Sequence, residues 1–403
     1  MTALGRTSQA PSLLRGHHEG GMGRRVGPGG VVVVADSSAV GSSSALPSVP
    51  PDVRSRRPGP TGDALAGFEL PPALEASEPP EARGVPRDAV RMMVSRRRTG
   101  EVTHHRCADL PGLLLPGDLL VVNTSATLPA AVRCGPGLVM HFSTALPDGS
   151  WLAELRAVRG HATQPFPGGA PGQALPLPGG AVATLAERVT GRLWRVRLST
   201  AVVPYLLRHG SFIHYSYVSS DWPAEAYQTV FATTPGSAEM PSASRPFTAE
   251  ILARLVVRGV TIAPLTLHTG VSSLEGDEEP YPEPYDIPPA TARLVDATRQ
   301  AGGRVVAVGT TVVRALETAA AAREQGTDGP LPASAGWTHH LVTPRTPPRV
   351  VDALFTGLHE PRSSHLLMLN AFAGPDLLRR CYAAAVEHSY LWHEFGDVHL
   401  LLP

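Results

Sequence analysis

The sequence predicts an α/β protein in which a small antiparallel β-barrel domain is inserted into a domain built on a mostly parallel sheet. Two observations carry this prediction. From residue 248 onward, apolar runs typical of buried strands alternate with helical segments, as in parallel sheets covered by helices. Between residues 131 and 199, short apolar runs are separated by Gly/Pro clusters, which is the spacing of a small antiparallel barrel.

The chain is therefore divided into three predicted parts. Residues 1–65 are rich in Gly, Ser, Pro and Arg and have almost no apolar periodicity, which predicts a disordered tail. Residues 66–130 and 200–403 are assigned to the α/β domain, and residues 131–199 to the inserted barrel.

The elements follow from apolar runs, turn residues and helix caps. In the α/β domain we expect strands at residues 90–94, 101–106, 119–122, 260–268, 304–308, 350–358 and 398–402. Helices are expected at residues 201–209, 248–258, 289–301, 363–372 and 376–386, and from Thr310 toward Gly326. The barrel strands are expected at residues 138–142, 151–158, 181–185 and 193–198, and residues 324–337 are expected to form a polar loop.

Composition limits the partners. The chain has 403 residues with 35 acidic and 35 basic side chains, and every basic one is arginine. Zero net charge gives no global attraction to a polyanion, so a nucleic acid would need a local arginine patch, for which residues 96–98 are the densest candidate. The same residues also fit an ordinary solvated turn.

Cysteine and histidine spacing favours a reducing compartment and no metal. The three cysteines lie far apart without a C-x-x-C pair, which excludes the usual zinc ribbon and predicts buried thiols. Histidine pairs are adjacent in sequence, so one helix face cannot present both rings to a metal. No apolar run approaches the ~20 residues of a membrane span. We expect a cytoplasmic, metal-free monomer.

Residues 304–317 form the candidate centre of the site. An apolar run ends at Gly309, and Thr310 and Thr311 offer a helix N-cap hydroxyl. A strand that turns into a helix there directs free N–H groups and the positive dipole end at one place, which suits a carboxylate or phosphate. Arg314 and Glu317 could pair with each other or face that place. An ordinary strand–helix junction would give the same pattern.

Other strand ends should converge on this place, because ligands in open α/β sheets gather outside the carboxyl ends of strands. His268 and His359 each follow a predicted strand, and Glu283 and Tyr285 lie in a Pro-rich loop beside the same edge. Each histidine could equally be a satisfied structural residue, and Glu283 a plain loop carboxylate.

Short motifs occur in a fixed order from Phe68 to the C-terminus. They include Phe68-Glu69-Leu70-Pro71-Pro72, Pro116-Gly117-Asp118-Leu119-Leu120-Val121-Val122-Asn123, Tyr227-Gln228-Thr229-Val230-Phe231-Ala232, Gly236-Ser237, Leu265-Thr266-Leu267-His268, Val308-Gly309-Thr310-Thr311, Ala371-Phe372-Ala373-Gly374 and Gly396-Asp397. In this order the chain resembles the S-adenosylmethionine:tRNA ribosyltransferase-isomerases of queuosine biosynthesis.

The resemblance implies a reaction and a set of site residues. The ribosyl part of S-adenosylmethionine would be transferred to 7-aminomethyl-7-deazaguanine in a tRNA and isomerised to an epoxycyclopentane, with adenine and methionine released. Because the sulfonium acidifies the adjacent C–H, a positioned base can start this chemistry without a metal. Glu283 would be that base or would hold a ribose hydroxyl. The implied contacts to the adenosine side are Tyr227, Gln228, Gly236 and Ser237.

The chain also departs from the family pattern. Asn-Asp-Thr-Arg is replaced by Asn123-Thr124-Ser125-Ala126, and a histidine is lost where Arg245-Pro246 stands. Such losses of ionisable groups leave a second hypothesis open, in which a relative uses or binds S-adenosylmethionine with a small-molecule acceptor.

Overall fold

The structure is a computed structural model and describes residues 65, 68–160, 162–218, 220–271, 281–323, 329–360, 363 and 365–403. Except for Leu65, the predicted tail lies outside these residues. The division into a tail, a barrel domain and an α/β domain stays a prediction.

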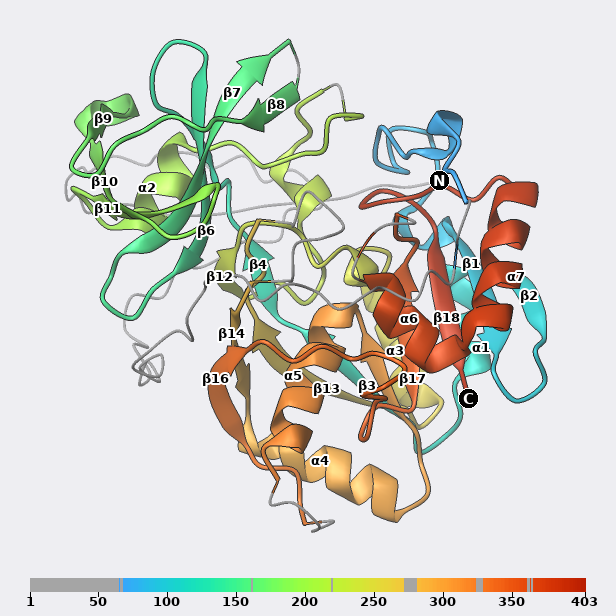
Figure 1. Ribbon diagram of the computed structural model, residues 1–403. Helices are drawn as coiled ribbons and strands as arrows, with labels where there is room; N and C mark the ends of the chain where they lie inside the picture. Colours follow the sequence, from blue (N-terminus) through green and yellow to red (C-terminus); the bar gives the residue numbers. More distant parts are fainter. Residues whose placement is uncertain are drawn as a thin grey trace, which may run out of the picture. The chain divides into compact units, whose positions relative to one another are not determined.

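A nine-stranded sheet organises the α/β part, in the order β16-β14-β13-β3-β15-β17-β18-β1-β2 (Figure 1). Its strands are β1 (Arg91–Arg96), β2 (Val102–Arg106), β3 (Leu119–Asn123), β13 (Thr261–Leu267), β14 (Glu283–Ile287), β15 (Val305–Val308), β16 (Ser334–Thr338), β17 (Ala353–Gly357) and β18 (Val398–Leu402).

The sheet is mixed, and the expectation of a mostly parallel sheet is wrong. Only β13–β3, β3–β15, β15–β17 and β18–β1 pair in parallel, and the other neighbours pair antiparallel. The cause at β18 is visible in the element order. Two helices, α6 (His365–Ala373) and α7 (Pro375–Glu387), separate β17 from β18. The chain re-enters the sheet at the edge where β17 ends, so β18 runs antiparallel to β17.

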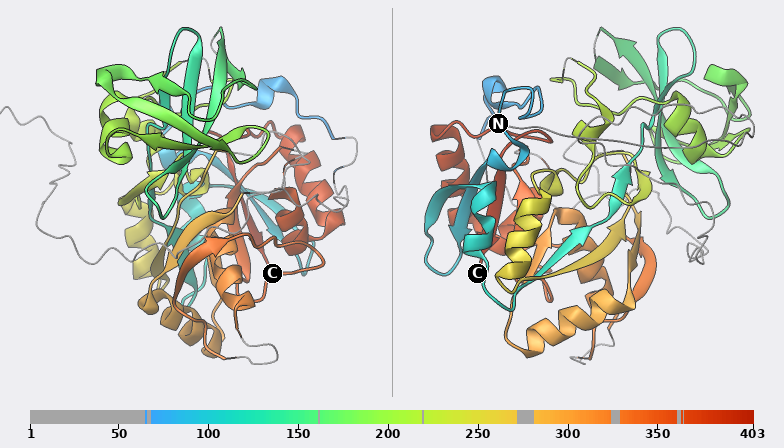
Figure 2. Two further views of the ribbon diagram at one scale, coloured as in Figure 1. Left: turned by 60° about the vertical axis from the view of Figure 1, so that its left-hand side comes forward. Right: turned by 180° about the vertical axis from the view of Figure 1, so that it is seen from behind.

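Helices cover both faces of this sheet (Figure 2). Leu119 and Val121 pack in one apolar cluster with α4 (Pro289–Gln300), α5 (Thr310–Ala321), α6 and α7. Leu120 and Val122 point the other way, into a cluster with α1 (Leu110–Leu113) and α3 (Ala249–Val257). A strand buried on both faces reads as a continuous apolar run, which is why residues 119–122 were recognisable.

The second sheet is antiparallel and has seven strands. They are β5 (Ala131–Arg133), β6 (Leu138–Ala145), β7 (Trp151–Arg159), β8 (Ala162–Pro165), β9 (Ala174–Pro176), β10 (Val182–Arg188) and β11 (Leu193–Leu198). The pairing order is β5-β6-β7-β11-β10-β9, with β8 on β7. Among the described strands no pairing joins β9 back to β5, so the sheet is a half-barrel and closure is not confirmed. Helix α2 (Val202–His209) packs on its apolar side.

Two predicted loops contain strands. Residues 283–287 form β14, and the end of the expected polar loop at 324–337 forms its partner β16. Proline and glycine in these stretches concealed them, because both residues are depleted in strands. The prediction of buried thiols is confirmed: Cys107, Cys134 and Cys381 are all free and buried.

Candidate functional site

The candidate site lies at the carboxyl edge of the parallel strands β13, β3, β15 and β17. Their registers pair Leu265 with Asn123, Val121 with Ala307 and Val308 with Phe355, so the four strands end side by side. His268 follows β13, Gly309 follows β15 and His359 lies shortly after β17. Polar residues at these ends are therefore brought to one edge.

Helix α5 starts at this edge, but its cap differs from the prediction. Its N-cap is Gly309, at φ 91° and ψ 151°, and none of the described side chains caps the helix. This backbone conformation is reached by glycine almost alone. Thr310 is already helical and buried, and Thr311 Oγ1 accepts a hydrogen bond from Asn123 Nδ2 at 3.3 Å. The expected threonine N-cap is wrong, because glycine makes the turn that the hydroxyl was expected to stabilise.

Asn123 joins neighbouring strand ends and was missed as a site residue. Its Nδ2 donates to Leu267 O at 2.9 Å, and its Oδ1 accepts from Leu267 N and Ser125 N, each at 3.0 Å. The side chain is fully buried. The available signal was an amide directly after a wholly apolar strand, at the edge where the other candidates were placed.

His268 is held by two serines. Its Nδ1 lies 2.7 Å from Ser125 Oγ, which lies 2.6 Å from Ser237 Oγ. The serines belong to the two-stranded parallel sheet of β4 (Ser125–Thr127) and β12 (Thr234–Ser237). Burial lowers the pKa of His268 to about 4, so the imidazole is neutral at pH 7. Gly236 leaves room for it, since a Cβ there would lie 2.4 Å from Nδ1.

Glu283 forms an ion pair with Arg314. Its Oε2 accepts from Arg314 Nη1, and its Oε1 accepts from Gly270 N at 3.0 Å. Burial raises the pKa of the Glu283 carboxyl, although Arg314 opposes this. Arg314 Nη2 also donates to the carbonyls of Tyr281 and Thr338, at 3.3 and 3.2 Å. A carboxylate, a guanidinium and the His268 cluster thus share one edge of the sheet.

Glu317 was expected either to pair with Arg314 or to face the site, but its carboxylate binds backbone amides instead. Its carboxylate accepts N–H bonds from Arg349, Val350 and Val351 at 2.8, 2.9 and 3.0 Å. It holds the segment that leads into β17.

Three other predicted residues lie in packed surroundings. Tyr285 belongs to the apolar core below the edge, and its hydroxyl lies 3.3 Å from Ser334 Oγ. Tyr227 is 2% exposed, and its ring stacks on Phe212 at 4.7 Å. Gln228 uses its amide to pair with the backbone N–H and carbonyl of Thr127, at 3.1 and 2.8 Å. Their catalytic or ligand-binding roles stay predictions.

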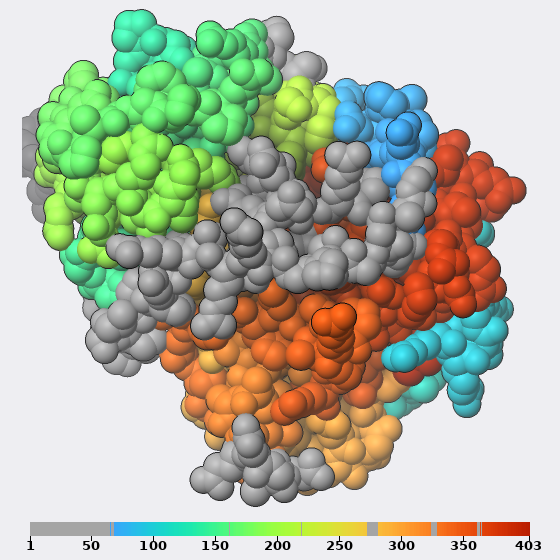
Figure 3. Space-filling view, viewed as in Figure 1, coloured from blue at the N-terminus to red at the C-terminus, as the bar shows by residue number. Residues whose placement is uncertain are grey.

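His359 anchors the end of β17. Its Nε2 lies 2.8 Å from Thr356 Oγ1, and its ring stacks on His365 at 4.4 Å with 7° between the planes. Burial and the neighbouring histidines hold its pKa well below the usual value. In the space-filling view, the red surface of the C-terminal residues lies beside the orange surface of the residues that precede them in the chain (Figure 3).

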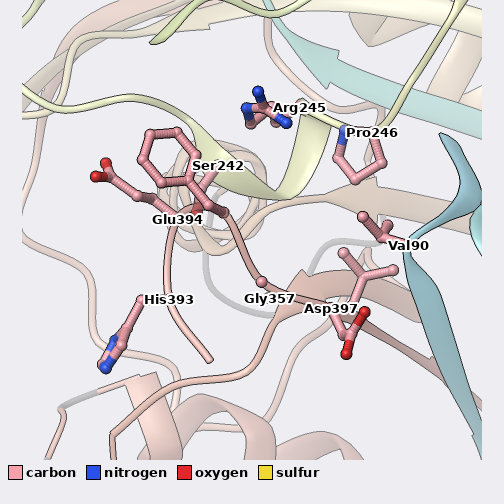
Figure 4. A pocket seen from close by; sticks show the side chains of 11 residues that line it. Val90, Ser242, Arg245, Pro246, Gly357, His393, Glu394 and Asp397 are labelled. Atoms are coloured by element: carbon pink, nitrogen blue, oxygen red, sulfur yellow. The ribbon is translucent and has the colours of Figure 1, made fainter. Parts of the chain in front are cut away.

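A small pocket opens where β17 ends and β18 begins (Figure 4). It is lined by Val90, Ser242, Arg245, Pro246, Gly357, His393, Glu394, Phe395, Gly396, Asp397 and Val398. Burial raises the pKa of Glu394 to about 8, and its Oε1 has no hydrogen-bond partner among the described residues. Asp397 instead accepts the backbone N–H groups of Arg91 and Leu391, as a turn-forming residue does. His393 and Glu394 were not predicted as site residues, because they follow no periodic segment.

The described residues contain no group of three or more His, Cys, Asp or Glu side chains that could hold a metal ion. That the protein needs no metal is still a prediction. None of the described helices is long and apolar enough to cross a bilayer.

The fold and the site define an α/β protein with a cluster of polar side chains at the carboxyl ends of its parallel strands. The family model described as queuosine biosynthesis protein matches residues 66–401, and the chain belongs to this family. The assignment made from the sequence motifs is confirmed.

The chain is similar to known proteins over nearly the whole length of those proteins. The S-adenosylmethionine:tRNA ribosyltransferase-isomerase of Moorella thermoacetica is 34% identical over 368 residues, which is 83% of this chain and 98% of the relative. That of Acidiphilium cryptum is 37% identical over 363 residues, covering 84% and 99%. A crystal structure of the S-adenosylmethionine tRNA ribosyltransferase of Thermotoga maritima is 30% identical, covers 83% of this chain and 99% of that chain, and has a TM-score of 0.48.

Proposed function

We propose that this chain transfers the ribosyl moiety of S-adenosylmethionine to 7-aminomethyl-7-deazaguanine in tRNA and isomerises it, giving epoxyqueuosine with release of adenine and methionine. The observation that carries the proposal is the match to the queuosine biosynthesis family over residues 66–401. Relatives that are 98% and 99% covered bear the name of this activity, which favours a tRNA acceptor over a small molecule.

The Glu283 carboxylate is the proposed base. The sulfonium of the ribosyl donor acidifies the neighbouring C–H, and a carboxylate with one N–H bond and one guanidinium partner keeps lone pairs for that proton. Burial raises the Glu283 pKa, which makes the carboxylate a stronger base than an exposed one. Arg314 keeps the carboxylate oriented toward the edge.

The start of α5 is the proposed binding place for an anionic or oxygen-rich part of the donor. The first turn of a helix presents unpaired N–H groups and the positive dipole end. Gly309, Thr310 and Thr311 form that turn, and Thr311 is tied to Asn123 at the neighbouring strand end. In this proposal His359 and Tyr285 remain catalytic candidates. The contacts to the adenosine side of the donor are Tyr227, Gln228, Gly236 and Ser237.

The tRNA would contact a surface other than residues 96–98. Arg96 ends β1, and Arg97 and Arg98 follow it. Strand β1 is parallel to β18, which is antiparallel to β17, so β1 ends at the sheet edge opposite the site. Arg96 also pairs with Glu101 at 3.6 Å, as in an ordinary hairpin turn. A monomeric state stays part of the proposal.

The decisive experiment incubates the full chain with S-adenosylmethionine, with and without tRNA that carries the 7-aminomethyl-7-deazaguanine base. Adenine release that requires this tRNA, together with epoxyqueuosine in the digested product, is the expected result. Adenine release with a small amine in place of tRNA would show that the acceptor is a small molecule. No adenine release under any of these conditions would contradict the proposal.

Donor binding is tested separately by calorimetry and thermal unfolding. A ligand at a hundredfold excess over its Kd stabilises the folded state by about 2.7 kcal/mol. Thr311→Val should reduce this stabilisation because it removes the hydroxyl bonded to Asn123. Thr318→Val, later in the same helix and bonded to Arg314 O and Thr338, is the matched control and should bind normally. Absence of binding at millimolar donor would reject S-adenosylmethionine as substrate.

A further inference from the structure

The two serines beside His268 form a directed chain of hydrogen bonds. Ser237 Oγ already accepts the backbone N–H of Thr269 at 3.0 Å and is fully buried. Within the described part of the chain, the acceptor within reach of its own O–H is Ser125 Oγ, at 2.6 Å. The Ser237 hydroxyl therefore donates to Ser125, since a buried hydroxyl without an acceptor carries a full desolvation penalty.

This direction fixes the next bond. Ser125 is also fully buried, and each hydroxyl has one proton to donate. With its oxygen accepting from Ser237, Ser125 donates to His268 Nδ1 at 2.7 Å. In the reverse arrangement, Nδ1–H would donate to Ser125 and Ser125 to Ser237, and the Ser237 proton would have no acceptor.

The surrounding backbone holds this geometry. Asn123 Oδ1 binds Ser125 N, and the pairing of β12 with β4 shifts register between Pro235 and Ser237. A bulge of this kind redirects a side chain, and here it falls at Gly236, against which the His268 ring lies. The His268 backbone N–H donates to Pro284 O at 3.0 Å.

We infer that Ser237 and Ser125 are positioning residues that fix His268 as the Nε2–H tautomer, so that His268 donates a hydrogen bond to the ribosyl donor instead of acting as its base. Its Nε2 makes no hydrogen bond to the described residues, which leaves this N–H for a ligand oxygen or nitrogen. Burial, which lowers the pKa of His268 to about 4, keeps the ring neutral at pH 7. The tautomer follows from the fold alone, whereas the ligand contact rests on the proposed function.

The tautomer is measured on the ligand-free full chain by ¹⁵N-histidine spectra at pH 7, with the His268 signals assigned through His268→Gln. We expect a protonated Nε2 and an unprotonated Nδ1. Ser125→Ala should give a mixture of tautomers and a higher pKa, because the bond that favoured the neutral ring is lost. Ser125→Thr keeps the hydroxyl and should restore the original spectrum.

Ser244→Ala is the matched control, because Ser244 is also fully buried and its hydroxyl donates to one carbonyl, Pro241 O, at 2.9 Å. It should leave the His268 spectrum unchanged. A protonated Nδ1 or a charged ring in the unmodified chain would overturn the inference, as would a spectrum that Ser125→Ala does not alter. These outcomes are independent of whether the chain releases adenine.

The donor role is tested by turnover. Glutamine places an N–H near the position of Nε2, so His268→Gln should keep adenine release within about tenfold, whereas His268→Ala should lose about 10²-fold. Equal losses in both variants would assign His268 to base catalysis and reject the donor role.

Discussion

Two arginine–carboxylate pairs lie at opposite edges of the same sheet and differ in how completely they are bonded. At the amino edge, Asp118 accepts the Arg304 side chain at Nε and Nη2, the Arg304 backbone N–H and the Leu115 N–H. At the carboxyl edge, Glu283 accepts the N–H of Gly270 and one nitrogen of Arg314. Counting bonds to the described residues, the first carboxylate has both oxygens fully used, whereas the second keeps lone pairs.

The difference separates a structural ion pair from a reactive one of the same chemistry. A carboxylate with every lone pair occupied fixes two strands and cannot take a proton without losing bonds. A carboxylate with free lone pairs and a raised pKa, such as Glu283, can take a proton without losing bonds. Four variants test this comparison, and they are ordered by the size of the expected effect.

Asp118→Asn should cause the largest loss of stability. The Asp118 side chain is 2% exposed, and its removal as an anion leaves Arg304 without its partner. We expect the free energy of unfolding to fall by about 3 kcal/mol in denaturant titrations. Adenine release per folded molecule should stay unchanged, and a large loss of turnover would place Asp118 in the chemistry.

Glu283→Gln should mainly affect turnover. The amide keeps the shape but cannot take a proton, so adenine release should fall by ~10²-fold or more, about 2.7 kcal/mol in barrier height. Donor binding should change little. Asp286→Asn, on the same strand β14, is the control and should leave turnover intact. If Asp286→Asn lowered turnover as much as Glu283→Gln, Glu283 could not be distinguished as the reactive carboxylate.

Glu394→Gln should change the pH dependence of stability. The folded-state pKa of about 8 lies above the ordinary value of 4.5, so folding favours the protonated carboxyl. This contribution is complete below about pH 4.5 and is lost as the pH rises toward 8. Unfolding curves of the unmodified chain should show this decline, and Glu394→Gln should lack it. Glu101→Gln, at the exposed turn after β1, should retain it.

Thr248→Ala should have the smallest effect. Thr248 caps helix α3 by accepting the Ile251 N–H, and it also bonds Asp88 Oδ2 at 3.2 Å. Loss of an N-cap typically costs ~1 kcal/mol. Because this residue serves the helix, we expect a small drop in melting temperature at full turnover. A turnover defect would extend the reactive region to α3.

Sequence patterns revealed the strands that are buried on both faces. They missed the strands that form only through pairing with neighbouring strands. Strands such as β3 and β15 read as apolar runs, because both of their faces are covered. Strand β14 begins Glu283-Pro284-Tyr285, and only pairing with β13 and β16 makes it a strand. The antiparallel β18 depends on the number of helices before it, which sets the direction of re-entry.

The same limit applies to the site. Gly309, His268 and Glu283 could be named because each stands at a break in a local pattern. Arg314 and Ser237 were also named, but their pairing could not be predicted, because Ser125 and Ser237 are 112 positions apart and Arg314 lies 31 positions after Glu283. Such contacts are set by strand order, and local sequence carries no record of it.

The carboxylate of Glu317 has a consequence for motion. By binding the amides of three successive residues, Arg349 to Val351, it joins the third turn of α5 to the entry of β17. The helix that carries Arg314 and the strand that leads to His359 are thereby held as one rigid unit. Binding there costs little ordering entropy, since the groups are already in place before a ligand arrives.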